Sequence, residues 1–443
     1  MKTVDTLLSA KWVIPVEPSG QTIEDATIAI KNGDIVGLVT NDAAQTQYRA
    51  SETLDFPHHA IIPGLVNTHT HAAMTLLRGF ADDLPLETWL NQYIWPAESR
   101  WVGTEFVKAG TTLAAAEMIQ SGTTCFSDMY FFPDAAAEAA VLAGIRACIG
   151  LIMIDFPSAW APNSEEYLNK GLDLHDKLRH EPLVTTAFAP HAPYSVSDAP
   201  LEKIRVLADE LDIPIHMHVH ETEKEINESM ARFGVRPLER LSQLEMLSPK
   251  LLAVHMTQLL QGEIEALAEN GCHVLHCPES NLKLASGLCP VNKLQNSGVN
   301  VALGTDGTAS NNDLDMFGEM RMASLLAKGI SGDPTALPAH ETLKLATLNG
   351  ARALGMEERI GSIVPGKAAD LVAIDLSGIV TQPVYEPVSQ IVYSASRDQV
   401  TDVWVGGRRV LDNRHLTTMD EQDLQAEAKS WGKKIQSDKQ FSS

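Results

Sequence analysis

The chain has 443 residues, 44% of them hydrophobic, which is enough to form a large buried core. Its 57 acidic and 34 basic residues give a formal net charge of −23, which argues against a nucleic-acid partner and against binding to an anionic membrane surface. The sequence has neither a run approaching the roughly 20 apolar residues of a membrane-spanning helix nor the features of an N-terminal signal peptide, so we expect a cytoplasmic protein.

Both ends of the chain carry the alternating pattern of short β-strands. Residues 4–40 alternate apolar and polar side chains around the turn Lys31-Asn32-Gly33-Asp34. The pattern returns at residues 361–374 and 400–411, where Gly406-Gly407 is typical of a hairpin turn. We therefore predict one small β-sandwich domain built from both termini.

Between these flanks, apolar runs rich in β-branched residues alternate with Ala-, Leu- and Glu-rich segments of helical spacing. The eight runs cover residues 60–67, 123–128, 147–154, 183–189, 214–219, 251–255, 272–276 and 300–304. Such alternation indicates parallel β/α units, and eight of them predict an α/β fold of the (β/α)8 TIM-barrel type.

These patterns predict the domain boundaries. Residues 1–60 and 361–420 would form the two parts of the β-sandwich, residues 61–360 the catalytic barrel, and residues 421–443 a polar C-terminal helix and tail. The chain has five cysteines, an odd number, scattered and mostly within apolar runs. We expect them to be reduced thiols in the core, because a disulfide framework needs paired cysteines.

Polar residues that can bind a metal follow the predicted strands. His69 and His71 come after the first strand, and residues i and i+2 of a strand point to the same face. His218 ends the fifth strand and Asp306 follows the eighth. Three nitrogens and one oxygen, with a position left for water, are the pattern of a catalytic metal site. All four lie at the carboxyl ends of strands, where barrel enzymes place their chemistry.

The fifth strand offers three histidines, and spacing alone does not select the ligand. His216, His218 and His220 could all face inward. His216 lies deeper in the strand, so we expect it to be a hydrogen-bonded core residue, and Glu221 three residues later favours His218.

Three further histidines end other predicted strands. His255 ends the sixth strand, beside the expected water, which favours a functional role. For His276, loop architecture and substrate contact stay equally open. His191 ends the fourth strand, and residues 183–196 contain no lysine that could bridge two ions. The sequence therefore predicts a mononuclear site.

Longer strings carry a family resemblance. His69-x-His71, His218-x-x-Glu221, His255 and Asp306 together resemble the amidohydrolase superfamily. The strings that narrow this are Pro63-Gly64-Leu65-Val66-Asn67-Thr68, Leu77-Arg78-Gly79-Phe80-Ala81-Asp82-Asp83, His276-Cys277-Pro278-x-Ser280-Asn281-x-Lys283 and Pro365-Gly366-Lys367-x-Ala369-Asp370-Leu371. They are similar to the branch of aminohydrolases and chlorohydrolases, and within it most similar to deaminases of methylthioadenosine and S-adenosylhomocysteine.

The resemblance implies a metal-dependent deaminase acting on the 6-amino group of a purine nucleoside. His69, His71, His218 and Asp306 would hold one zinc ion per chain, with ferrous iron as the alternative. Asp306 would take a proton from the attacking water and His255 would orient that water. Glu221 would protonate the purine ring, and ammonia would leave.

The resemblance also implies how substrate is held. Glu98 would bind the ribose hydroxyls, Trp89 would line the pocket, and His191 and Glu221, with Asp306, would contact the purine. We further expect a homo-oligomer, a dimer or tetramer. The alternatives are a guanine or oxidised-purine deaminase, a triazine amino- or chlorohydrolase of the same branch, and a non-catalytic metal-binding protein.

The loop after the third strand predicts a preference for methylthioadenosine over S-adenosylhomocysteine. A site for the amino-acid carboxylate should offer an arginine, and residues 151–167 contain neither arginine nor lysine. Arg146 starts that strand and should lie at the far end of the barrel, whereas Arg78 or Arg100 could reach in from other loops. The loop instead offers an apolar set suited to a thioether methyl and an acidic set that would repel a carboxylate: Phe156, Pro157, Ala159 and Trp160, and Asp155, Glu165 and Glu166.

Overall fold

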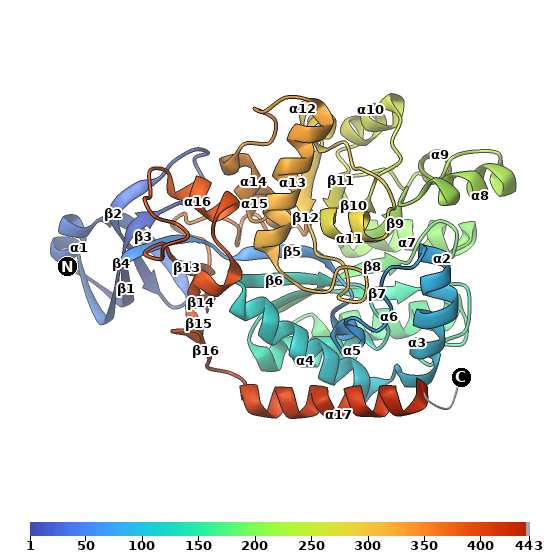
Figure 1. The fold of residues 1–443 in the computed structure, drawn as a ribbon, viewed down its shortest axis with the longest axis horizontal. Helices are drawn as coiled ribbons and strands as arrows, with labels where there is room; N and C mark the ends of the chain where they lie inside the picture. Colours follow the sequence, from blue (N-terminus) through green and yellow to red (C-terminus); the bar gives the residue numbers. More distant parts are fainter. Residues whose placement is uncertain (440–443) are drawn as a thin grey trace. The chain divides into compact units, whose positions relative to one another are not determined.

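The computed structural model describes residues 1–439 (Figure 1). Residues 440–443 of the predicted C-terminal tail lie outside the described residues. Contacts divide the chain into two compact units. The first comprises Met1–Asn67, Glu117–Cys125 and Asp315–Thr418, and the second comprises Thr68–Ala116, Phe126–Leu314 and the chain from Met419 onward. In the described part of the chain, no helix combines the length and apolar character needed to cross a membrane.

The first unit contains an eight-stranded sheet to which both termini contribute, as predicted. Its strands, in spatial order, are β16 (His415–Leu416), β15 (Arg408–Asp412), β14 (Val400–Val405), β13 (Leu371–Asp375), β4 (Tyr48–Pro63), β1 (Lys2–Val13), β2 (Ile23–Lys31) and β3 (Asp34–Thr40). Asn32 and Gly33 both have positive φ, as do Gly406 and Gly407. Two consecutive residues of this kind match the right-handed twist of the strands in a tight hairpin.

The first unit also holds short helices and a buried core. The helices are α1 (Asn41–Gln47), α13 (Met316–Ser331), α14 (Ala339–Leu345), α15 (Leu348–Ala353) and α16 (Pro387–Tyr393). Leu8, Ile28, Ile61 and Trp404 are buried in one cluster against the inner face of the sheet. Alternating apolar side chains of its strands supply this core, which is why the flanks showed a period of two.

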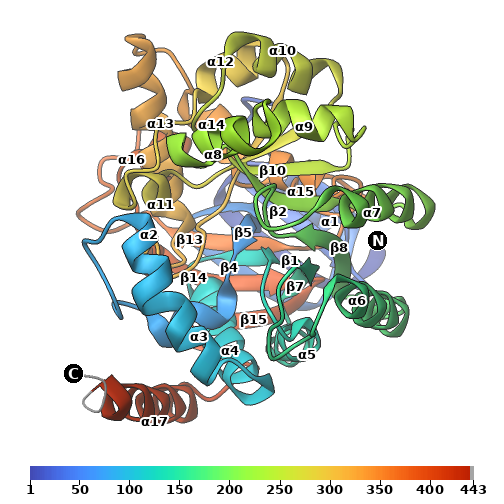
Figure 2. The same cartoon turned by 90° about the vertical axis from the view of Figure 1, so that its right-hand side faces the viewer.

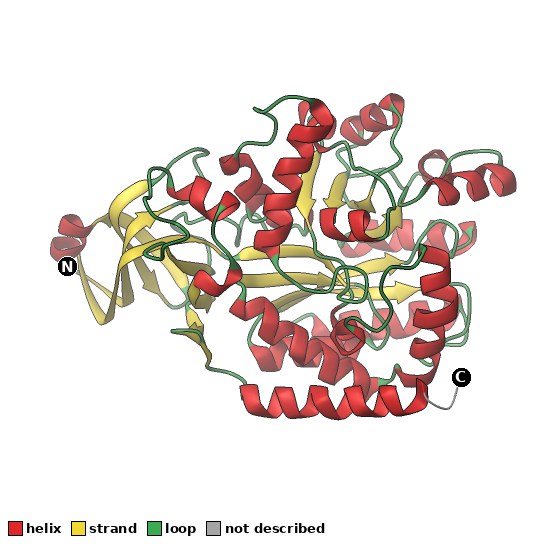
Figure 3. Ribbon diagram, viewed as in Figure 1, coloured by secondary structure: helices red, strands yellow, loops and turns green. Residues whose placement is uncertain are grey.

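A second sheet has eight strands in sequence order, each strand beside the next. Figure 3 draws the strands of the chain in yellow and the helices in red. The strands of the second sheet are β5 (Leu65–Thr70), β6 (Thr123–Asp128), β7 (Arg146–Met153), β8 (Val184–Pro190), β9 (Ile215–Val219), β10 (Leu251–His255), β11 (His273–His276) and β12 (Asn300–Leu303). The Thr68 hydroxyl donates to the Leu303 carbonyl at 2.8 Å, and the Asp306 amide donates to the His69 carbonyl at 2.9 Å. These bonds join the first strand to the end of the last, so the parallel strands form a nearly closed barrel, as predicted.

Helices follow the barrel strands in the second unit. They are α4 (Thr104–Gln120), α5 (Pro133–Ala143), α6 (Ser164–Leu178), α7 (Asp198–Leu211), α8 (Glu223–Phe233), α9 (Pro237–Gln243), α10 (Gln261–Glu269), α11 (Pro278–Lys283) and α12 (Val291–Asn296). Figure 2 shows α5, α6 and α7 around β7 and β8, which they contact. Asn163 and Thr222 start α6 and α8 by accepting backbone N–H bonds at the first turn, which compensates unpaired amides of the helix end.

One predicted strand was wrong. The apolar run 60–67 is divided: residues 60–63 are the end of β4 in the first sheet, and the barrel strand β5 begins at Leu65. Gly64 separates them, and a Cβ added there would lie 1.9 Å from the Thr124 hydroxyl oxygen. The run is apolar throughout because both segments are buried, so its pattern carried no sign of the break. The five cysteines are free and buried, as expected.

We predict that Gly64→Ala destabilises the protein. The added methyl meets the β-branched Thr124 side chain, and overpacking of this kind typically costs about 1–3 kcal/mol. The control is Gly262→Ala in α10, where an added Cβ meets nothing within 4 Å and alanine favours the helix by about 0.5–1 kcal/mol. Thermal unfolding of both variants checks this. An unchanged melting temperature for Gly64→Ala would contradict the close approach.

Candidate metal centre and active site

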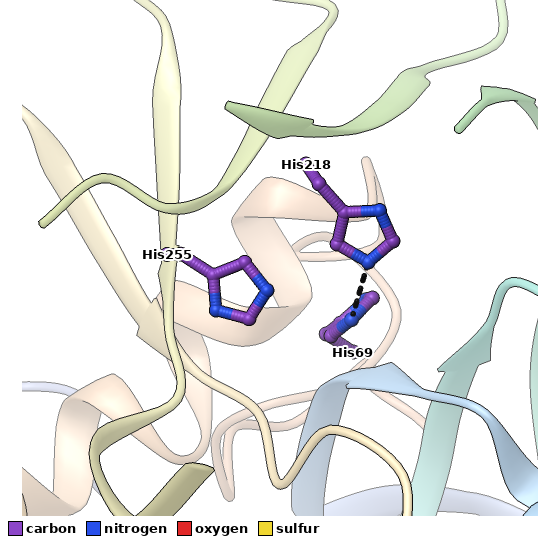
Figure 4. A group of neighbouring side chains, drawn as sticks. All are labelled: His69, His218 and His255. Atoms are coloured by element: carbon purple, nitrogen blue, oxygen red, sulfur yellow. Dashed lines mark hydrogen bonds between the residues drawn. The ribbon is translucent and has the colours of Figure 1, made fainter. Parts of the chain in front are cut away.

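Four side chains predicted as metal ligands converge at the carboxyl ends of the strands. The Nε2 atoms of His69 and His71 lie 3.3 and 3.2 Å from the same oxygen, Oδ1 of Asp306. The Nε2 atoms of His218 and His69 are 3.2 Å apart, and His255 lies beside them with its ring stacked on that of His218 (Figure 4). β5, β9, β10 and the turn after β12 thus bring together residues up to 237 positions apart, as 306 − 69 gives.

The second nitrogen of each of three imidazoles faces a hydrogen-bond acceptor. His71 Nδ1 lies 2.6 Å from the Met129 carbonyl, His218 Nδ1 lies 2.8 Å from the His191 carbonyl, and His255 Nδ1 lies 2.9 Å from Asn281 Oδ1. A carbonyl oxygen accepts only, so Nδ1 must carry the proton. The lone pair of each Nε2 then points to the centre, which is how ligating histidines are oriented in proteins.

His216 supports the fourth imidazole from behind. Its Nε2 lies 2.8 Å from His69 Nδ1, and its Nδ1 lies 3.3 Å from the Ser127 hydroxyl. Burial lowers the pKa of His216 well below its usual value, so the ring is neutral. His220 Nε2 accepts the Leu238 amide instead, outside the centre. Of the three histidines around β9, only His218 reaches the cluster, and His216 is the hydrogen-bonded core residue that its depth in the strand predicted.

The Asp306 carboxylate is buried and ionised. Burial alone would raise its pKa, but the hydrogen bonds and charges of His69 and His71 hold that pKa well below its usual value. Its second oxygen, Oδ2, accepts the hydroxyls of Ser280 and Ser310 at 2.6 and 2.9 Å. Its backbone adopts a left-handed φ of 63°, a conformation that is costly for aspartate and is found where function requires it.

This donor set fits a divalent cation. The negative charge of Asp306 outweighs the effect of burial and raises the pKa of His71 to about 9. Without a metal, His71 therefore keeps a proton, and this proton supplies the positive charge of the centre. Burial lowers the pKa of His69 to about 4, so its imidazole is neutral. Its Nε2 lies 3.2 Å from His218 Nε2, close enough for one cation to be bound by both nitrogens. Three imidazole nitrogens and one carboxylate oxygen suit Zn²⁺ or Fe²⁺.

A cavity of about 690 Å³ opens onto this centre. His71, His218, His255 and Asp306 line it, together with Glu221. Glu221 Oε1 accepts the Ser286 hydroxyl at 3.2 Å, and Oε2 lies 4.0 Å from His255 Nε2. The volume falls in the range of small-molecule sites, and a titratable carboxyl group lies beside the candidate metal ligands within it.

Glu98 enters the same cavity from a different part of the chain. It belongs to α3 (Trp95–Trp101), which continues from α2 (Leu86–Trp89) through a π-helical turn, η2 (Leu90–Ile94). The Tyr130 hydroxyl donates to Glu98 Oε1 at 2.7 Å. Burial raises the pKa of Glu98 to about 7, against the opposing effects of Tyr130 and His71. A carboxyl group held in this way can recognise hydroxyl donors of a ligand.

His191 and Trp89 also line the cavity, as expected, and His276 does not. His191 Nδ1 lies 3.0 Å from the Ser195 hydroxyl, and burial lowers its pKa to about 3, so it is a neutral hydrogen-bonding group. Trp89 is 6% exposed. The carbonyl of His276 accepts the Gly304 amide at 3.0 Å, joining β11 to the end of β12, which favours the architectural alternative for this residue.

The comparisons with known proteins agree with this geometry. The sequence model of the amidohydrolase family matches residues 60–410. The chain belongs to the amidohydrolase family. It is 49% identical to the 5-methylthioadenosine/S-adenosylhomocysteine deaminase of Teredinibacter turnerae, over 98% of both chains.

Two solved structures share the fold of this chain. A crystal structure of an adenosine deaminase from Xanthomonas campestris with bound zinc has a TM-score of 0.98 and 52% identity, covering 98% of this chain and 99% of that one. The atrazine chlorohydrolase of Arthrobacter aurescens has a TM-score of 0.89 at 23% identity, covering 96% of this chain and 99% of that one. The second likeness concerns the fold alone.

Sequence reasoning missed the residues that support the amidohydrolase centre. Asn281 and Ser280 hydrogen-bond to His255 and Asp306 respectively. Both belong to the string His276-Cys277-Pro278-x-Ser280-Asn281-x-Lys283, but no role was predicted for either of them. Ser310 and Ser286 have no distinguishing pattern. Tyr130 lies two residues after the end of β6, and its place near the carboxyl end of a barrel strand was the one signal that could have identified it.

We predict one tightly bound divalent ion per chain in this amidohydrolase. His69→Ala and His218→Ala should each lose the ion, because each removes a nitrogen donor from the cluster. His175→Ala is the control, since its imidazole lies on α6 and bonds to Thr186 of β8, outside the cluster. Elemental analysis after exhaustive dialysis measures the content, and two retained ions per chain would contradict the mononuclear site.

Proposed function

We propose that this amidohydrolase deaminates the 6-amino group of an adenosine derivative, preferably methylthioadenosine, to an inosine-type product and ammonia. The observation that carries the proposal is that one cavity holds the His/Asp cluster, Glu221 and the Glu98–Tyr130 pair. A nucleoside would fit this arrangement of groups, with its purine at the His/Asp cluster and its ribose at Glu98. The names of the relatives support the same substrate class.

The metal is the first part of the proposal. His69, His71, His218 and Asp306 would hold one zinc ion, as the zinc of the Xanthomonas campestris structure suggests, and the same donors would accept ferrous iron. A bound ion of this kind supplies a water whose pKa is lowered toward neutrality.

Three side chains would move or hold the protons. Asp306, ionised beside two imidazoles, accepts a proton from the attacking water. His255 donates through Nδ1 to Asn281, which leaves Nε2 to accept a hydrogen bond from that water and orient it. Glu221, held by Ser286, donates a proton to the ring nitrogen next to the carbon under attack. Protonation relieves the charge that builds up as the aromatic ring is broken. The proton that Asp306 accepted then passes to the amino group, which leaves as ammonia, and the proton of the new hydroxyl returns to Glu221.

The remaining groups would position the nucleoside. Glu98 accepts hydrogen bonds from the ribose hydroxyls, and its fixed carboxyl favours a ribosylated substrate over a free base or a triazine. His191, neutral and hydrogen-bonded to Ser195, contacts the purine edge, and Trp89 supplies an apolar wall.

The homo-oligomer, the cytoplasmic location and the domain boundaries stay predictions.

The preference for methylthioadenosine rests on the wall of the cavity. No arginine or lysine lines it in the described part of the chain, whereas Phe156, Pro157 and Ala159 do. Arg78 donates to the Asn312 carbonyl, and Arg100 lies over the Trp101 ring instead of lining the cavity. A carboxylate entering here would lose its water without gaining a cationic partner.

Part of the expected basis for that preference was wrong. Asp155 accepts the Ser197 amide at 2.8 Å, and Glu165 and Glu166 lie in the first turn of α6. None of the three lines the cavity, and neither does Trp160. The missing cation, not a set of repelling acids, distinguishes the two substrates.

We expect Glu221→Gln and Asp306→Asn to fold and to lose most turnover. Each keeps its shape but removes a proton-transfer group, a loss that typically costs about 10² to 10⁴ in rate. Ammonia release from methylthioadenosine measures turnover, and metal analysis should separate the two, because only Asp306 is proposed as a ligand. Near-normal deamination by Glu221→Gln would contradict the proton-donor role.

We also expect the catalytic efficiency on methylthioadenosine to exceed that on S-adenosylhomocysteine. The purine and ribose are common to both, so the difference reports the wall around the sulfur. The measurement compares kcat/KM for the two nucleosides at one pH and ionic strength. Equal values, or the reverse order, would overturn this preference and leave the deaminase proposal standing.

A further inference from the structure

The last helix of the chain contacts the part of the barrel that carries Glu98. α17 (Glu421–Lys439) belongs to the second unit, as do α3 and the first turns of α4. In Figure 1 it lies beside α4, and it contacts η1 (Ala72–Leu77), the turn that follows His71. This polar terminal helix has no evident part in the chemistry, yet it contacts the turn that follows a candidate metal ligand.

Trp431 makes the aromatic contacts of α17. Its ring packs edge-on against Trp101, the last residue of α3, with centroids 6.4 Å apart, and edge-on against Phe106 of α4 at 5.4 Å. Lys434 lies 4.4 Å over the Trp431 ring, and Arg100 lies 5.6 Å over the Trp101 ring. Edge-to-face pairs have a defined geometry and an energy beyond simple burial, and cations over the ring faces add to both.

Trp101 and Glu98 are three residues apart on one short helix. The backbone bond from the Val102 amide to the Glu98 carbonyl, 2.9 Å long, closes the last turn between them. On the other side α3 continues into the π-helical turn η2, where Trp95 N–H bonds to the Leu90 carbonyl. Such turns are rare and frequently lie at functional sites. At its other end α3 packs through Trp101 against Trp431, so this contact bears on the direction of Glu98.

We propose that Trp431 is a positioning residue for substrate binding, acting through Trp101 to hold Glu98 against Tyr130 in the cavity. This inference rests on the proposed function, because it assigns Glu98 to the nucleoside. Trp431 does not line the cavity. Its loss should let α3 shift and weaken the hold on ribose, while the His/Asp cluster and Glu221, carried by strand ends, keep their geometry.

The test is a double-mutant cycle on the full-length, metal-loaded enzyme with methylthioadenosine. Trp431→Ala should raise KM by about twofold to tenfold, the equivalent of one aromatic pair, with kcat and metal content unchanged. Trp431→Phe should recover most of the affinity. In a Glu98→Ala background the same Trp431→Ala change should leave KM almost unaltered, because residues that act through one another are not additive. Lys433→Ala, an exposed change on the same helix, is the matched control.

Several results would overturn the inference. If Trp431→Ala lowers only the melting temperature, or raises KM equally with and without Glu98, Trp431 is a packing residue and no more. If that variant is not recovered folded, Trp431→Leu is measured by the same cycle. Wild-type enzyme without nucleoside deaminase activity would overturn the proposed function and this inference together, whereas active wild type with an unchanged KM in Trp431→Ala would overturn the inference alone.

Discussion

The close approach of one buried carboxylate to two imidazoles is the interaction on which the rest of the site depends. Asp306 Oδ1 lies within 3.3 Å of the Nε2 atoms of both His69 and His71. An isolated buried carboxylate would be protonated, but here the imidazoles keep it ionised. The same charge demands a positive partner, which is a proton on His71 or a metal ion at the centre. Metal binding and proton release are therefore linked in this cluster.

That interaction sets what the surrounding backbone must do. His255 and Asp306 both have left-handed φ values, 76° and 63°, and each such residue costs on the order of 1–3 kcal/mol. Asn281 and Ser280, both in α11, bind His255 and Asp306 respectively, and Ser310 adds a second bond to Asp306. One short helix thus stabilises two strained strand ends. This gives a physical reason why the string that contains Ser280 and Asn281 occurs together with the candidate metal ligands, although it supplies none of them.

The sequence was sufficient for the residues whose direction follows from strand periodicity. His69, His71, His218 and Asp306 end buried parallel strands, and such ends meet at one face of a barrel. It was insufficient where two buried segments join, as at Gly64, because continuous apolar character hides a change of sheet. It also could not place the supports: the acceptors of the Nδ1 protons are partly backbone carbonyls, as at Met129 and His191, which no side-chain pattern encodes.

The two ends of the cavity are built by different means, and this separates reaction from recognition. Strand ends hold the proposed ligands and Glu221 in the core of the second unit, where close packing leaves the side chains little room to move. Glu98 and Trp89 instead lie on the α2–η2–α3 segment, a run of helix that contains a π-helical turn. Changes there can alter which nucleoside binds without moving a proton-transfer group. The loop after β7, which contributes Phe156, Pro157 and Ala159 to the cavity wall, lies outside the barrel sheet, so changes in it can likewise leave the strand ends in place.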